Sequence, residues 1–173
     1  MSSVISSIAI EAIRELLIIL QTRNTINQSL KNDFYKEQGK LSELLPIIFE
    51  IRHDGPISDS DLLDIKTITS LSMKEGEDVD DFKDRICDEC TKIRIRMDLL
   101  KEIWMKNLDE CQVIARNILS EIGAEIIYYE DSTIISSIKF GTTEYSDNRI
   151  YDTNKSDIIE NTLFLAGRVL SSY

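Results

Sequence analysis

The stretch that decides the fold runs from Phe82 to Gly123 and reads FKDRICDECTKIRIRMDLLKEIWMKNLDECQVIARNILSEIG. Apolar residues recur in it at the near-heptad spacing that keeps one face of an α-helix apolar. They are Phe82, Ile86, Ile93, Met97, Leu100, Trp104, Leu108, Cys111, Ala115, Ile118 and Ile122. Glycine commonly ends a helix, and Gly123 closes the run. We therefore predict one long helix that forms the central scaffold.

Three shorter helical patterns precede this helix. The first keeps a stripe apolar at Ile5, Ala9, Ala12, Leu16, Ile19, Ile26, Leu30 and Phe34. We expect Gly39 to end or weaken it, because glycine is a poor helix former. A second helix follows over residues 41–51, with Pro46 near its first turn, where proline is tolerated. After Gly55 and Pro56, Asp59 or Ser60 can cap a third helix that carries Leu62, Ile65, Ile68 and Leu71.

The pattern changes after Gly123. Residues 125–129, 133–140 and 143–151 are rich in Ile, Thr, Tyr and Phe and are separated by short turns, as expected for strands. A last helix is predicted from about Ser156 to Leu170. The predicted fold is mainly α, with a four-helix bundle-like domain over residues 1–123. A small β-rich domain with a terminal helix follows over residues 124–173.

Charge and composition exclude several classes of function. The 173 residues include 20 Lys and Arg against 31 Asp and Glu, so the formal net charge is -11. Binding to DNA depends largely on Lys and Arg, so we expect no direct sequence-specific DNA binding. Glu11, Arg14 and Glu15 interrupt the apolar run near the N-terminus, which argues against a membrane segment. Three cysteines, an odd number, favour an intracellular, reduced compartment such as the cytoplasm or nucleoid, or the nucleus of a eukaryote.

Few residues carry an obvious chemistry. The one histidine, His53, cannot form a histidine-pair metal site alone, and we expect it to be solvated or to cap a helix. Cys87 and Cys90 have the spacing of a redox motif, yet they fall inside a predicted helix, where a structural role is more common. The acidic residues 75–84 lack the EF-hand pattern and fit a helix start. We therefore expect no enzyme activity, no cofactor and no metal.

A local basic segment stands out from the acidic background. The segment from Phe82 to Lys106 contains seven Lys and Arg residues and five acidic residues. Arg94 and Arg96 flank Ile95, and Trp104 follows on the same helix. Such arginines can pair with carboxylates of a neighbouring helix, or they can mark a partner surface, where Arg and Trp are common anchors. Both alternatives stay open at this point.

Three segments together resemble a subunit of the GINS complex. They are TKIRIRMDLLKEIW at 91–104, NDFYKEQGKLSELLPIIFEIRHD at 32–54, and FGTTEYSDNRIYDTNKSDIIENTLFLAGRVLSSY at 140–173. The order of a helical domain followed by a small β domain is similar to an archaeal GINS subunit. The resemblance implies a non-enzymatic replisome scaffold that joins a sister GINS subunit and bridges the replicative helicase and a RecJ/Cdc45-like protein.

Under this resemblance, Arg94 and Arg96 match the basic motif of the long helix. Tyr145, Tyr151 and the residues from Ile158 to Leu170 match the strand and last helix of the small domain. The candidate interaction residues are Arg94, Arg96, Trp104, Tyr145, Tyr151, Leu163 and Leu170.

Two other functions remain possible. The first is a helical adaptor, antitoxin-like or viral, with no replisome role. The GINS subunit and the adaptor both imply a protein partner. The wide apolar faces support such a partner, because Ile13, Leu17, Ile18 and Leu20 lie off the first apolar stripe. The second is a thiol enzyme that uses Cys87 and Cys90, which predicts a thiol pKa well below the usual value.

Overall fold

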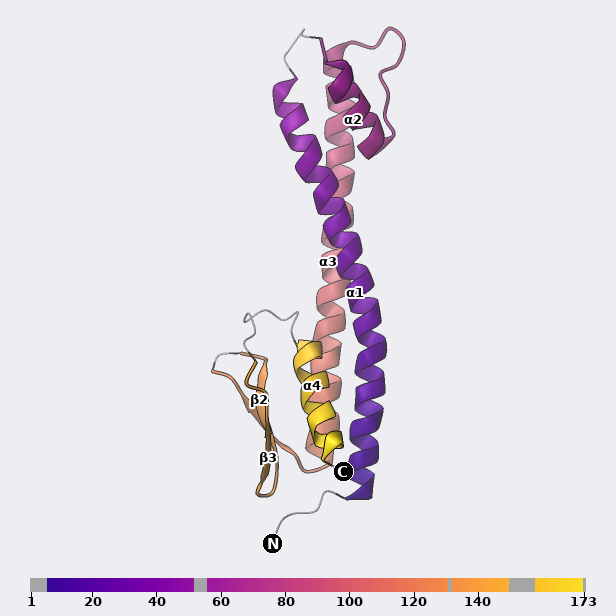
Figure 1. Ribbon diagram of the computed structural model, residues 1–173. Helices are drawn as coiled ribbons and strands as arrows, with labels where there is room; N and C mark the ends of the chain where they lie inside the picture. Colours follow the sequence, from indigo (N-terminus) through magenta and orange to yellow (C-terminus); the bar gives the residue numbers. More distant parts are fainter. Residues whose placement is uncertain (1–5, 52–55, 131, 150–157, 173) are drawn as a thin grey trace. The chain divides into compact units, whose positions relative to one another are not determined.

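The chain folds into four helices and a small sheet. The computed structural model describes residues 6–51, 56–130, 132–149 and 158–172 (Figure 1). The elements are α1 (Ser7–Glu50), α2 (Asp59–Thr69), α3 (Val79–Glu121), β1 (Glu125–Tyr128), β2 (Ile135–Phe140), β3 (Thr143–Ser146) and α4 (Ile158–Ser171). The predicted mainly α fold, with a small β-rich segment and a terminal helix, is confirmed.

The predicted break at Gly39 is wrong. Helix α1 runs unbroken through Gly39, so three helices rather than four precede the sheet in the described part of the chain. One glycine costs a helix only about 1 kcal/mol relative to alanine. Glu37, two residues before the glycine, offsets part of this cost by binding both Lys40 of α1 and Arg96 of α3. Pro46 lies one turn before the end of α1 and not in a first turn.

The capping residue of α2 also differs from the prediction. Ser58, rather than Asp59 or Ser60, occupies the N-cap, and its Oγ accepts a hydrogen bond from the Asp61 N–H at 3.1 Å. The structure places Ser58 in an extended conformation, as an N-cap requires. At α3 the same role falls to Asp78, whose Oδ1 accepts from the Asp81 N–H at 2.8 Å.

The chain divides into two compact units. Residues 30–102 form one, here called the continuous unit, and residues 1–29 with 103–173 form the other, here called the composite unit. The limits of these units fall inside α1 and α3 and not at Gly123, the expected boundary. Independent folding of residues 124–173 therefore stays a prediction.

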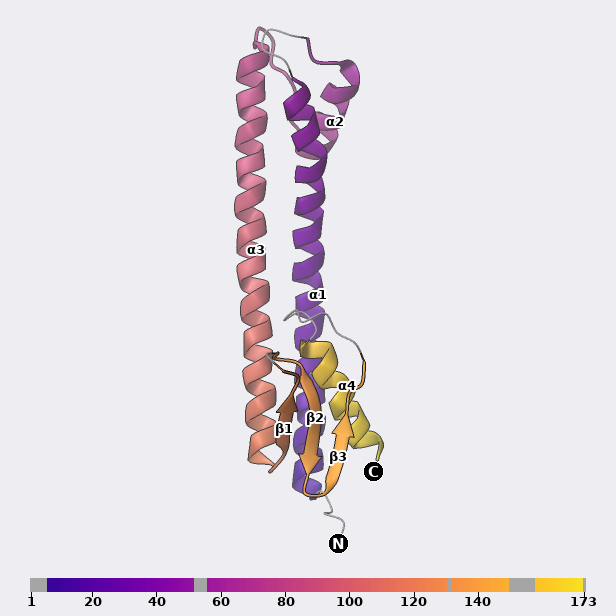
Figure 2. The same cartoon turned by 90° about the vertical axis from the view of Figure 1, so that its left-hand side faces the viewer.

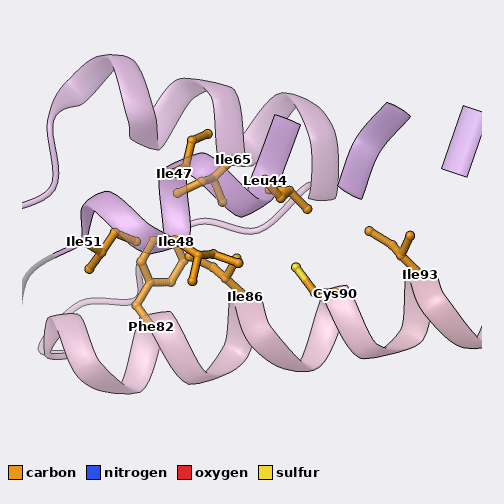
Figure 3. Close-up of a cluster of buried hydrophobic side chains, with 9 residues drawn as sticks. All are labelled: Leu44, Ile47, Ile48, Ile51, Ile65, Phe82, Ile86, Cys90 and Ile93. Carbon is orange, nitrogen blue, oxygen red and sulfur yellow. The ribbon is translucent and has the colours of Figure 1, made fainter. Parts of the chain in front are cut away.

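The core of the continuous unit is apolar and draws on three helices (Figure 3). Its buried members from α1 and the residue after it are Leu44, Ile47, Ile48 and Ile51, those from α3 are Phe82, Ile86, Cys90 and Ile93, and α2 contributes Ile65. Phe82, Ile86 and Ile93 were predicted to share one face of the long helix, and all three are buried. Burying a side chain of this size stabilises a fold by about 1.5–3 kcal/mol.

In the composite unit, three antiparallel strands lie in the order β1-β2-β3, with α4 packed against β2 and β3 (Figure 2). Gly141, with φ +63°, opens the two-residue turn between Phe140 and Thr143. A positive φ at this position is typical of the type II′ turn, which matches the twist of the strands it joins.

A buried polar network ties α4 to the sheet. Asn161 of α4 accepts a hydrogen bond from the Ile135 N–H at 2.7 Å and donates to the Ile135 carbonyl at 2.9 Å and to Asp147 Oδ2 at 3.0 Å. Asp147 in turn binds Arg149, whose guanidinium lies 3.9 Å from the ring centroid of Phe164. The network fixes the position of α4 on β2.

The apolar stripe predicted for the first helix does not stay on the buried side of α1 along its length. Ile13 and Leu20, which were placed off the stripe, are fully buried, whereas Ile26, which was placed on it, is half exposed. A straight helix turns by about 20° per heptad relative to a seven-residue repeat, so positions 12, 19 and 26 drift around the helix. Asn27 takes the buried position next to Ile26.

Candidate interaction surface

Helix α3 carries an exposed row of large apolar side chains. Ile95, Leu99 and Ile103 are 54%, 53% and 53% exposed. Each four-residue step advances about 40° around an α-helix, so the three lie along one side within a span of about 80°. Helix α3 is unbroken through these positions. We call this row the α3 stripe.

The same helix is apolar on the opposite side. Ile93, Trp104 and Leu108 are buried there, with exposures of 1%, 7% and 0%. A helix that covers only its own core needs one apolar face. The α3 stripe is therefore surplus to the packing of α3 within the described residues.

Charged residues border the α3 stripe. Lys92 precedes Ile95 by three residues, and Lys106 follows Ile103 by three. Helical geometry places both lysines within the sector of about 80° around the helix axis that holds the α3 stripe. Asp98 and Glu102, both exposed, lie along one flank, and Arg96 lies on the other. Lys92 is paired with Glu89 at 3.8 Å on the solvent-exposed surface, a type of ion pair that contributes little.

Arg96 joins α3 to α1. Its Nε donates a hydrogen bond to Glu37 Oε2 at 3.1 Å, and Lys40 Nζ lies 3.1 Å from the other oxygen of the same carboxylate. Partial burial by itself would raise the pKa of Glu37, but the hydrogen bonds and charges of Lys40 and Arg96 outweigh it and lower that pKa below 4.5. Of the two alternatives for the arginines, pairing with a neighbouring helix applies to Arg96, whose partner is Glu37 of α1. Arg94 is also exposed and has no ion pair with a described residue of α1.

Two aromatic candidate residues are buried. Trp104 lies in the apolar side of α3, and Tyr145 of β3 is 8% exposed and packs edge-to-face on Phe140 with ring centroids 6.4 Å apart. Leu163 and Leu170 are half-buried on α4. Tyr151 and His53 lie outside the described residues. The structure thus does not gather the candidate residues at one surface. Arg96 borders the α3 stripe, whereas Arg94 lies about 140° around the helix from Leu99.

Two of the three cysteines, Cys90 and Cys111, have the environment of structural thiols. Cys87 is half-buried, and Cys90 and Cys111 are buried. Burial raises the pKa of the Cys90 thiol, and burial raises the pKa of Cys111 as well. A thiol enzyme needs the opposite shift, because the thiolate is the nucleophile. Among the described residues, no group of three or more His, Cys, Asp or Glu side chains is placed to hold a metal ion.

The α3 stripe is not part of the apolar pattern that predicted the long helix. Ile95 was noted only as the residue between two arginines, and Leu99 and Ile103 fall off the main apolar pattern of the long helix. The usable signal is the second apolar series at steps of four, on the side opposite the first. Such a series indicates a second contact face whenever the same helix already has a core face.

Comparison with known proteins does not assign this chain to a family. No protein-family model, no curated protein and no solved structure matches this chain. Within the ranges that the structure describes, no helix combines the length and the apolar character needed to cross a membrane.

Proposed function

We propose that this chain is a non-enzymatic protein-interaction subunit that binds its partner through the α3 stripe. The single observation behind the proposal is that α3 is apolar on two opposite sides, of which only one is buried among the residues that the structure describes. Exposed apolar side chains in a row lower the solubility of a free chain, and their usual role is to be covered by a partner. A row at helical spacing suits a partner helix, which packs its own ridges against it.

A pull-down from the native host tests the proposal. The tagged wild-type chain is compared with Leu99→Glu, which puts a charge in the middle of the α3 stripe. The matched control is Leu63→Glu on α2, where the side chain is 65% exposed and distant in sequence from the stripe. We expect the same protein to be recovered with wild type and Leu63→Glu and lost with Leu99→Glu.

Helical content by circular dichroism must be equal in the three proteins. Ile95→Glu provides a second disruption of the stripe at another exposed position. Recovery of the partner in full amount with both stripe variants would contradict the proposal.

We further propose a narrower form of this function, as a GINS-type subunit of a replisome. Its support is the resemblance of three segments, together with the order of helices, small sheet and terminal helix. The expected partners are a sister GINS subunit, the replicative helicase and a RecJ/Cdc45-like protein, which places the chain in the cytoplasm or nucleoid, or in a nucleus. Arg94 and Arg96 are both exposed, but Arg96 is paired with Glu37, so Arg94 is the first residue to test in such a complex.

Mass spectrometry of the recovered proteins separates the narrower proposal from its rival. A second small GINS-like subunit together with the replicative helicase would support the replisome scaffold. One unrelated protein in stoichiometric amount would support the adaptor with no replisome role and overturn the GINS proposal.

A further inference from the structure

We infer that the partner segment on the α3 stripe is an amphipathic helix with an apolar centre and a carboxylate near each end. This inference rests on the proposed function, because it names the chemistry of the segment that covers the same stripe. Its basis is the pattern of exposed residues between Lys92 and Lys106 of α3.

The stripe is short and has a lysine beyond each end. Lys92 and Lys106 are separated by 14 positions of unbroken helix. Ile95, Leu99 and Ile103 lie between them on the same side. A partner helix that lies along the stripe therefore meets apolar side chains at its centre and an ammonium group near each end.

A second copy of this chain is a poor occupant. If two α3 helices pair in the same direction, Lys92 meets Lys92 and Lys106 meets Lys106. If they pair in opposite directions about Leu99, Lys92 meets Lys106. Both directions place lysine against lysine, and each chain also carries a net charge of -11.

Arg96, a further cation beside the stripe, does not offset this repulsion, and its guanidinium is already paired with Glu37 within the chain. Lys106, in contrast, makes no ion pair with any described residue. Carboxylates of a different protein, placed about 14 helical positions apart, would match the two lysines. Asp98 and Glu102 on one flank favour neutral or basic residues on the corresponding side of the partner helix.

Synthetic helices test the inference directly. Three labelled 18-residue peptides share Leu at three consecutive four-residue steps and differ only at their two ends, which carry Glu, Gln or Lys. Fluorescence anisotropy measures their binding to the full-length chain at low salt. We expect the Glu-ended peptide to bind at least about tenfold more tightly than the Lys-ended one, with the Gln-ended peptide between them.

Charge reversal in the protein supplies the matched control. In Lys92→Glu/Lys106→Glu, the order of the three peptides should invert, while Leu99→Glu should abolish binding of all three. Binding of all three peptides with equal affinity to wild type, together with loss in Leu99→Glu, would overturn the acidic-helix inference and leave docking on the stripe intact.

Two other outcomes would contradict docking of a partner helix on the α3 stripe. If no peptide binds, or if Leu99→Glu and Ile95→Glu bind as well as wild type, docking on the stripe fails and the proposed function fails with it. If sedimentation equilibrium shows a wild-type dimer that Leu99→Glu dissociates, the stripe belongs to self-association and the inference is overturned.

Discussion

Single residues hold the composite unit together through polar contacts as well as apolar ones. Asn161 is fully buried, and three hydrogen bonds join its side chain to described residues, two to Ile135 of β2 and one to Asp147 after β3. A buried amide side chain that forms hydrogen bonds with the backbone at the end of a strand stabilises the fold mainly because it leaves no buried N–H or carbonyl unpaired. The energy of each bond by itself is smaller. An apolar residue of the same shape would leave the Ile135 N–H and carbonyl without their partner.

The substitution Asn161→Leu should lower the free energy of unfolding by about 2–4 kcal/mol, because two buried backbone groups lose their hydrogen bonds. Urea unfolding followed by circular dichroism measures the change. Asn117→Leu, at an exposed position of α3, is the control and should change stability by less than about 0.5 kcal/mol. Equal effects of the two substitutions would show that the network contributes little.

The three thiols should react at different rates. Burial raises the pKa of Cys90 and of Cys111, which lowers the thiolate fraction near neutral pH and blocks access to reagent. With a disulfide reagent at about pH 7.5, we expect one thiol, that of half-buried Cys87, to react in the folded protein and the other two only on unfolding. The Cys87→Ser variant should lose the early reaction. Rapid reaction of Cys90 in this variant would revive the thiol-enzyme alternative.

The ion pair between Glu37 and Arg96 should make stability depend on pH. The folded-state pKa of Glu37 is lowered, so its contribution is fully present above the unfolded-state value of about 4.5 and disappears as pH falls through the folded-state pKa. Glu37→Gln should therefore lower the melting temperature near pH 7, and the difference from wild type should shrink toward pH 3. Glu43→Gln, at an exposed position of α1, should show no such trend. A constant difference across this range would assign the effect to packing.

At the scale of elements, the ends of helices follow local rules closely. Helix α3 ends in a Schellman motif, in which the Ala124 N–H donates to the Leu119 carbonyl at 2.9 Å and the Gly123 N–H donates to the Ser120 carbonyl at 3.1 Å. Gly123 has φ +82°, a conformation that costs other residues about 1–2 kcal/mol. The sequence predicted this end correctly, because only the local backbone decides it.

Two glycines should respond to alanine in opposite directions. Gly123→Ala should lower the free energy of unfolding by about 1 kcal/mol because of its positive φ. Gly39→Ala should raise it by about 0.5–1 kcal/mol, because Gly39 lies inside α1 and an added Cβ would meet nothing within 4 Å. Thermal unfolding of the two variants beside wild type checks the signs. Loss of stability in Gly39→Ala would show that α1 depends on a flexible point at residue 39.

At the scale of the whole molecule, the sequence predicted the class of fold and part of its core. The period of the long helix predicted Phe82, Ile86 and Ile93 as core residues, and the change of period after Gly123 predicted the strands. The continuity of α1 through Gly39 could not be predicted, because Glu37 is joined there to Arg96, 59 positions away. The α3 stripe depends on which side of α3 the core uses, and that choice is made by tertiary packing.

The composite unit also constrains how the chain folds during synthesis. Its two parts are separated in sequence by residues 30–102, and the contact between Arg23 and Asn107 joins positions 84 apart. The ribosome adds roughly 5–20 residues per second, so residues 1–29 emerge several seconds before residues 103–173 can cover them. Ile13, Leu16 and Leu20, which are buried in the native fold, are expected to lack their cover for that time. We therefore expect the N-terminal part of α1 to be open to chaperone binding during synthesis, although Ile13, Leu16 and Leu20 are among the best-buried residues of the native fold.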